Sequence, residues 1–163
     1  MTPQQARERF AAARVARLAT IDPSGRPHLV PIVFAVDGDT LYSAVDDKPK
    51  RTTELRRLGN VRANPSVSLL VDHYDEDWSK LWWVRADGTG RVLEAGTTEA
   101  RHAIMLLAER YPQQRAVGAV LAIDVARWSG WSSSGRAAIG DSGPGEVIAR
   151  VTARAAAVPQ RRT

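Results

Sequence analysis

The sequence contains no cysteine among its 163 residues, which excludes disulfide bonds, thiolate nucleophiles and thiolate-bound metals. It also lacks an apolar run long enough to span a bilayer. Its first residues, MTPQQARERF, carry charges that interrupt any apolar core of a secretory signal. We therefore expect a soluble, cytoplasmic protein.

Motifs of common hydrolases and nucleotide-binding proteins are missing as well. There is no G-x-S-x-G elbow and no G-x-x-x-x-G-K-[ST] loop, and GDSGPG does not follow a predicted strand. His28, His73 and His102 lie on different predicted elements without the spacing of metal ligands. Hydrolysis, nucleotide-triphosphate chemistry and a metal centre are therefore not indicated. His28 and His73, at strand ends, stay open for a binding role, whereas His102 is interpreted as structural.

The positive charge is unevenly distributed along the chain. The net charge is +5, with 44% hydrophobic and 25% charged residues, which is typical of a globular domain. Residues 135–163 hold five arginines against Asp141 and Glu146, which leaves an excess of only two for the rest. Bulk charge therefore does not support nucleic-acid binding, and the basic end has no interleaved aromatics. We predict a folded domain at residues 1–134 and a dispensable, disordered basic tail at 135–163.

Hydrophobic periodicity predicts a mainly β chain with flanking helices. Helices are expected at residues 3–13, 50–58 and 98–110, and strands at 15–21, 28–36, 41–45, 66–74, 81–94 and 119–131. Gly88 and Gly90 should bend or bulge the long fifth strand. Because strands outnumber crossovers and most are linked by hairpins, an antiparallel barrel is favoured.

The most basic stretch is DDKPKRTTELRRLGN, residues 46–60. With Pro49 near the start of the helix and Gly59 as its stop, residues 50–53 fall in the first turn, where free N–H groups favour an anion. Cations there oppose the helix dipole unless a ligand balances them. An anion site and a solvated helix with paired charges remain equally weighted alternatives. Arg56 and Arg57, expected nearer the helix end, require no ligand.

Trp82 and Trp83 are neighbours on a predicted strand, so they must point to opposite faces. One can fill the interior of the barrel. The other must cover something outside it, which is a helix, a second subunit or a flat aromatic ligand.

The ordered segments resemble a known family. ARLATIDPSGRPHLVPIVFAVDGDTLY, followed by DDKPKRTTELRRLGNVRANPSVSLLVDHYDEDWSKLWWVRADGTGRV, is similar to the pyridoxamine 5′-phosphate oxidase-like split-barrel superfamily, and within it to the actinobacterial deazaflavin-dependent oxidoreductases. The similarity covers about residues 3–134.

The resemblance implies a fold, an assembly and a site. The fold would be a six-stranded antiparallel split β-barrel of the FMN-binding type, and the protein a homodimer with two cofactor grooves at its interface. The cofactor's phosphate would lie at the first turn of the basic helix and its ring system along the second strand. The implied cofactor-binding residues are His28, Val30, Pro31, Val33, Ser43, Ala44, Lys50, Arg51, Thr52, Thr53, Asp72, His73, Tyr74 and Trp78.

Two departures from the FMN-binding branch indicate coenzyme F420. HLVPIVFAV has neither the arginine nor the lysine usual on that strand, and VARWSGWSSSG lacks the branch's arginine–histidine substrate motif. The function implied is hydride transfer between reduced F420 and an unsaturated small molecule, with no catalytic residue identified. The alternatives are an FMN-dependent oxidoreductase of the same class and a non-catalytic flavin or deazaflavin carrier. Lys50→Ala is expected to weaken F420 binding much more than Arg57→Ala.

Overall fold

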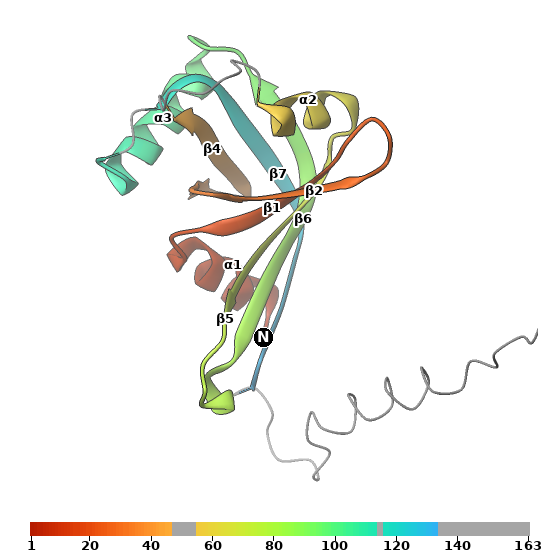
Figure 1. The fold of residues 1–163 in the computed structure, drawn as a ribbon. Helices are drawn as coiled ribbons and strands as arrows, with labels where there is room; N and C mark the ends of the chain where they lie inside the picture. Colours follow the sequence, from red (N-terminus) through yellow and green to blue (C-terminus); the bar gives the residue numbers. More distant parts are fainter. Residues whose placement is uncertain (47–54, 114–115, 134–163) are drawn as a thin grey trace, which may run out of the picture.

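The computed structural model describes residues 1–46, 55–113 and 116–133. The elements, in chain order, are α1 (Pro3–Ala12), β1 (Ala16–Ile21), β2 (Pro27–Ile32), β3 (Ala35–Asp37), β4 (Thr40–Asp46), α2 (Arg56–Ala63), β5 (Ser66–His73), the short 3₁₀ helix η1 (Trp78–Lys80), β6 (Trp82–Leu93), α3 (Thr98–Arg110) and β7 (Ala116–Ser132). The long strands β6 and β7 run through the molecule, with α2 and α3 toward one end and η1 at the other (Figure 1). The predicted tail at 135–163 lies outside the described residues.

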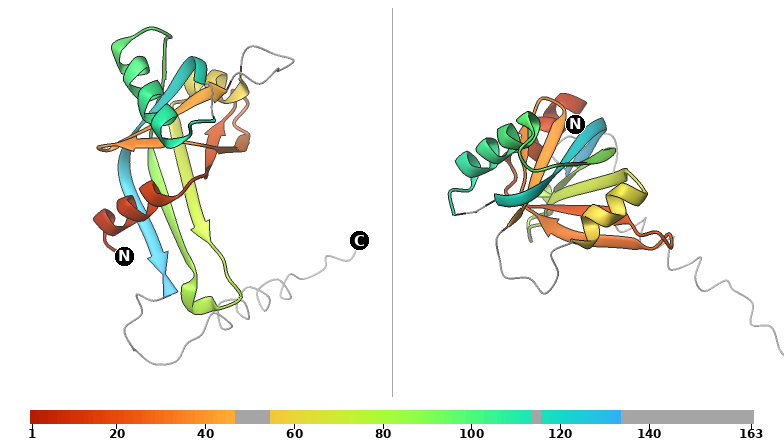
Figure 2. Two further views of the ribbon diagram at one scale, coloured as in Figure 1. Left: turned by 90° about the vertical axis from the view of Figure 1, so that its left-hand side faces the viewer. Right: turned by 90° about the horizontal axis from the view of Figure 1, so that it is seen from above.

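The strands form one antiparallel sheet in the order β2-β1-β5-β6-β7-β4-β3. This confirms a mainly β architecture with flanking helices. The expected six-stranded split barrel is corrected in its strand count and closure, because the described residues form an open sheet of seven strands. The predicted strand at residues 28–36 is broken, and its halves β2 and β3 form the two opposite edges of the sheet (Figure 2).

The break in that strand falls at Val33 and Phe34. Phe34 is fully buried, and its ring lies 5.0 Å from that of Phe10 on α1. Its carbonyl lies 3.0 Å from the hydroxyl of Tyr111, at the end of α3. Since that carbonyl bonds to a side chain rather than to a neighbouring strand, the ladder is interrupted and the chain turns to the other edge.

Two apolar clusters make up the core. The larger lies on the inner face of the sheet and is covered by α1 and α2; it includes Phe10, Leu18, Phe34, Leu58, Leu69 and Val84. The smaller lies between α3 and strands β4 and β7; it includes Ala44, Ala100, Ala103, Leu107 and Val120. Each helix therefore buries one face against the sheet, and no helix of the described residues covers the other face of β2, β1, β5 and β6.

The helix boundaries follow local signals in two cases and depart from the prediction in the third. Thr2 and Gln5 form a capping box at α1, and Thr97 caps α3. The predicted helix at 50–58 with a stop at Gly59 is wrong at its end, because α2 runs through Gly59 to Ala63. Pro65 sets the true end, since the residue before a proline avoids the helical region and Asn64 has φ −142°.

The prediction of a bulge in the fifth strand is confirmed at one of its two glycines. The register between β6 and β7 shifts at Asp87 and Gly88. A Cβ at Gly88 would collide with the backbone carbonyl of Asp124 on β7, so only glycine permits this approach. Gly90 has a different use, because its missing side chain lets Val61 of α2 pack against β6.

Within the described residues, no helix combines the length and apolarity that a membrane span requires.

Candidate functional site

A groove of about 640 Å³ lies on the uncovered face of the sheet. Its lining comes from β1, β2, β5 and β6 and from the residue after β5: Arg17, Ala19, Leu29, Ser68, Leu69, Leu70, Asp72, Tyr74, Trp83 and Arg85. Of the residues predicted from the sequence, Asp72 and Tyr74 line it, and Leu29 lies within the expected segment of β2. We refer to this hollow as the sheet groove. Its volume suits a drug-sized or cofactor-sized molecule.

Strand register determines which side chains share the groove's face. Trp83 on β6 lies between Asp72 on β5 and Trp131 on β7, so these three form a row across the sheet. In the next row on the same face, two residues earlier on β5, Leu70 lies between Arg17 on β1 and Arg85 on β6. The expectation that the adjacent tryptophans point to opposite faces is confirmed, since Trp82 packs against the core while Trp83 lines the groove.

Charges on this face are paired rather than free. Arg17 and Asp72 form an ion pair of 2.9 Å across β1 and β5. Asp87 accepts hydrogen bonds from the Ser68 hydroxyl, from Arg85 and from Arg127. Burial opposes ionisation of Asp87, but these hydrogen bonds outweigh it and lower the pKa of the carboxyl. The face can therefore be covered by another surface without leaving an uncompensated carboxylate.

Apolar side chains project from the same region. Leu29 is 64% exposed and Trp131 is 43% exposed, and beyond β5 Tyr74 and Trp78 are exposed as well. Exposed apolar side chains gathered around a groove mark a binding surface more strongly than scattered ones do.

The first turn of α2 is the most basic helix start in the described structure. It contains Arg56 and Arg57, has no acidic residue, and its N-cap Leu55 makes no side-chain capping bond. Arg56 reaches Asp22 at 3.4 Å. Arg57 is partly buried and has no hydrogen-bond or ion-pair partner among the described residues, and burial lowers the pKa of its guanidinium. The prediction that Arg57 lies near the helix end is wrong, and its position makes it the side chain of α2 best suited to an anion.

A buried polar chain joins α2 to the edge strand. Asn60 Nδ2 donates to Thr20 Oγ1 over 2.9 Å, and Thr20 Oγ1 in turn lies 3.4 Å from the carbonyl of His28 and 3.5 Å from its Nδ1. Both Asn60 and Thr20 are almost fully buried. Sequence reasoning missed these two residues. The available signal was a polar residue, Asn60, between Leu58 and Val61 on the apolar face of a helix.

The other predicted residues lie in several environments. Val30 packs against the core from β2, Pro31 is exposed on that edge strand, and Val33 packs against the cluster under α3. Ser43 and Ala44 are buried on β4, and neither lines the sheet groove.

His73 is exposed and stacks on Trp82 with ring centroids 6.2 Å apart. Lys50, Arg51, Thr52 and Thr53 lie outside the described residues. No group of three or more histidine or acidic side chains in the described part of the chain is arranged to hold a metal ion.

Comparison with protein families gives one match that covers most of the chain. The family model described as pyridoxamine 5′-phosphate oxidase matches residues 2–132. No curated protein matches the chain.

Solved structures share the fold at low sequence identity. A conserved hypothetical protein from Mycobacterium tuberculosis is 22% identical with a TM-score of 0.66, over 89% of this chain and 94% of that one. An FAD-binding protein from Mesorhizobium loti is 22% identical with a TM-score of 0.62, over 80% and 94%. HutZ, the heme storage protein from Vibrio cholerae, is 16% identical with a TM-score of 0.61, over 81% and 95%. At these identities the likeness establishes the fold alone.

Proposed function

The chain belongs to the pyridoxamine 5′-phosphate oxidase family, and on this premise we propose that it is an oxidoreductase that uses reduced coenzyme F420 as hydride donor to an unsaturated small molecule. The observation that carries the proposal is Arg57, a partly buried cation without a described partner at the uncapped start of α2. An unpaired, partly desolvated guanidinium is costly unless an anion completes it. F420 carries a phosphate and a glutamate tail, which would supply that anion.

The composition of the edge strands favours F420 over FMN. Residues 27–37, which span β2 and β3, contain no lysine or arginine, although the FMN-binding branch usually carries both there. The similarity to an FAD-binding protein keeps FMN as the alternative cofactor, and the similarity to a heme storage protein supports a non-catalytic carrier as the alternative role.

The protein's residues would bind and shield the cofactor. When bound, reduced F420 supplies the hydride. Arg57 and the free N–H groups of α2 would hold the phosphate, with Lys50 and its neighbours adding charge. The edge strand β2 would lie against the ring system, and Asp72 and Tyr74 would bound the groove and limit access of water. The proton that the substrate takes up with the hydride would come from solvent, His28, His73 or Tyr74, and we choose none of these over the others.

We further propose that the sheet groove is completed by a second copy of the chain. No helix in the described part of the chain covers the face that contains Trp83, Trp131 and Leu29, and the Arg17–Asp72 and Arg127–Asp87 charges on it are already paired. A homodimer through this face would bury the apolar side chains and enclose the cofactor between two subunits.

The deciding experiment compares Arg57→Met with Arg62→Met in titrations against F420 and FMN. Loss of a charge-assisted contact of roughly 1.5–3 kcal/mol should weaken F420 binding ten- to a hundredfold in Arg57→Met. Arg62, exposed in the last turn of α2, is the matched control and should change affinity little. Since Arg57 lacks a described partner, its replacement should leave the unfolding temperature of the cofactor-free protein unchanged or higher.

Two further measurements separate the alternatives. A deazaflavin fragment without phosphate or glutamates should bind Arg57→Met and wild type with the same affinity. Lys50→Ala is titrated in the same series. Equal F420 affinity in wild type and Arg57→Met would refute the anion site. Turnover of bound reduced F420 with added electron acceptors distinguishes an enzyme from a carrier.

A further inference from the structure

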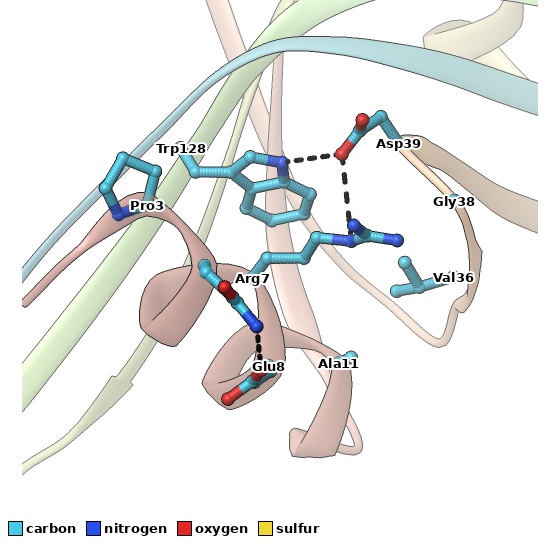
Figure 3. A pocket seen from close by; sticks show the side chains of 9 residues that line it. Pro3, Arg7, Glu8, Ala11, Val36, Gly38, Asp39 and Trp128 are labelled. Atoms are coloured by element: carbon cyan, nitrogen blue, oxygen red, sulfur yellow. Dashed lines mark hydrogen bonds and ion pairs between the residues drawn. The ribbon is translucent and has the colours of Figure 1, made fainter.

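A second cavity, also of about 640 Å³, lies between α1, the turn that joins β3 to β4, and β7. It shares no lining residue with the sheet groove. Its apolar walls are Pro3, Ala11, Val36 and the indole of Trp128 (Figure 3). Trp128 and Trp131 are three residues apart on β7, so they project from opposite faces of the strand. The cavity therefore lies on the other side of the sheet from the sheet groove.

One charged group of this cavity, the Asp39 carboxylate, is held by the fold. The Asp39 carbonyl accepts a hydrogen bond of 2.8 Å from the N–H of Val125, and the Asp39 Oδ1 accepts one of 3.2 Å from Trp128 Nε1. Arg7 lies on α1, whose first turn is locked by its capping box. A ligand that binds here thus meets an Asp39 carboxylate that is already positioned, which reduces the free energy lost in ordering it.

The ion pair between Arg7 and Asp39 is incomplete. Arg7 Nε lies 3.7 Å from Asp39 Oδ1, which is longer than a hydrogen bond (Figure 3). Within the described residues, the two terminal nitrogens of Arg7 and the Oδ2 atom of Asp39 have no hydrogen-bond partner. Glu8 adds a second carboxylate, of which one oxygen accepts from Gln4 over 3.1 Å. The cavity therefore presents a guanidinium with free donors beside a carboxylate with a free acceptor.

We propose that this cavity binds a small zwitterion with an apolar body, of the α-amino acid class. A cation and an anion side by side form a dipole, and the ligand that complements it carries the opposite dipole. The ligand's carboxylate would bind the terminal nitrogens of Arg7, and its ammonium group would bind Asp39. Its apolar body would lie against Trp128 and Val36.

Ligands with one charge fit less well. An amine would be attracted by Asp39 and repelled by Arg7, and a carboxylate would meet the reverse. A neutral apolar molecule would fill the cavity but desolvate the unpaired ends of both charges, which is unfavourable.

The test is a ¹H–¹⁵N titration of the full-length protein with L-phenylalanine, 3-phenylpropionate and phenethylamine. These probes share the phenyl group and differ in carrying both charges, the carboxylate alone or the ammonium alone. L-phenylalanine should shift the indole N–H of Trp128 saturably and bind at least about tenfold more tightly than either analogue. Equal affinity for all three probes, or no saturable shift of Trp128 up to about 10 mM L-phenylalanine, would overturn the proposal.

Charge-removing variants test the assignment of each end. Arg7→Gln should abolish the preference for L-phenylalanine over phenethylamine, and Asp39→Asn should abolish its preference over 3-phenylpropionate. Arg101→Gln on α3, away from the cavity, is the control and should keep both preferences. If either cavity variant folds poorly, the comparison of the three probes on wild type still decides. The cavity and the sheet groove share no lining residue, so bound F420 should leave the affinities for the three probes unchanged. A failed F420 titration therefore contradicts only the cofactor proposal, and a failed probe titration contradicts only the zwitterion proposal.

Discussion

Tyr111 links α3 to two distant parts of the backbone. Its buried hydroxyl lies 2.8 Å from the carbonyl of Arg14 and 3.0 Å from that of Phe34, and it accepts a hydrogen bond from Arg110 Nε. One side chain thus holds both the corner between β2 and β3 and the loop between α1 and β1. The corner between β2 and β3 is the position where the sheet's two edges separate.

Tyr111→Phe removes this hydroxyl while keeping the ring. Because the carbonyls of Arg14 and Phe34 then lose their partner inside the protein, the free energy of unfolding should fall by roughly 1–3 kcal/mol. Urea denaturation measures the change. Tyr74→Phe, at a side chain that is 75% exposed, is the control and should alter stability by less than about 0.5 kcal/mol. A Tyr111→Phe variant as stable as wild type would mean that the hydroxyl does not hold the corner.

At the scale of elements, α2 is the helix whose position matters most for the site, and Gly59 tests its extent. Gly59 lies inside α2 with negative φ, and a Cβ there would meet no atom within 4 Å. Gly59→Ala should therefore raise the free energy of unfolding by about 0.5–1 kcal/mol, since alanine loses less backbone entropy in a helix. Gly88→Ala, where the Cβ collides with β7, should lower it. Destabilisation by Gly59→Ala would favour the helix stop first expected at that position.

The ion pair between Asp22 in the β1–β2 turn and Arg56 on α2 should depend on pH. The Ser24 hydroxyl and the Arg26 N–H donate to Asp22 Oδ1 over 2.7 and 2.9 Å, and these bonds lower the pKa of the carboxyl. The stability that Asp22 contributes is therefore fully present above its ordinary pKa of about 4 and is lost as pH falls through the lowered value. Asp22→Asn should be less stable at neutral pH and lose less stability on acidification. Parallel acid-limb denaturation curves for both proteins would contradict this.

At the scale of the whole molecule, the proposed dimer depends on the face of the sheet that no described helix covers. Sedimentation velocity at micromolar concentration should give a dimer. Leu29→Glu should dissociate it, because the charge would be buried in the interface. Met105→Glu on α3, equally exposed at 64%, is the matched control and should stay dimeric. A wild-type monomer would refute both the dimer and the shared groove.

Much of the architecture was predictable from local sequence. Helix α1 and the hairpin strands follow from capping residues, alternation and turn residues, which act over a few positions. The bulge at Gly88 and the opposite orientation of Trp82 and Trp83 follow from strand geometry in the same way. These features depend on interactions between near neighbours in the chain, so the order of residues is sufficient to indicate them.

The sequence by itself determined a mainly β domain and its order of helices and strands. Only the tertiary structure decided that one predicted strand divides between two sheet edges, because Tyr111 removes the Phe34 carbonyl from the ladder. It also placed Arg57 in the first turn of α2 and joined Asn60 to Thr20, forty residues away. Such contacts depend on burial and on partners from distant segments, which local periodicity does not encode.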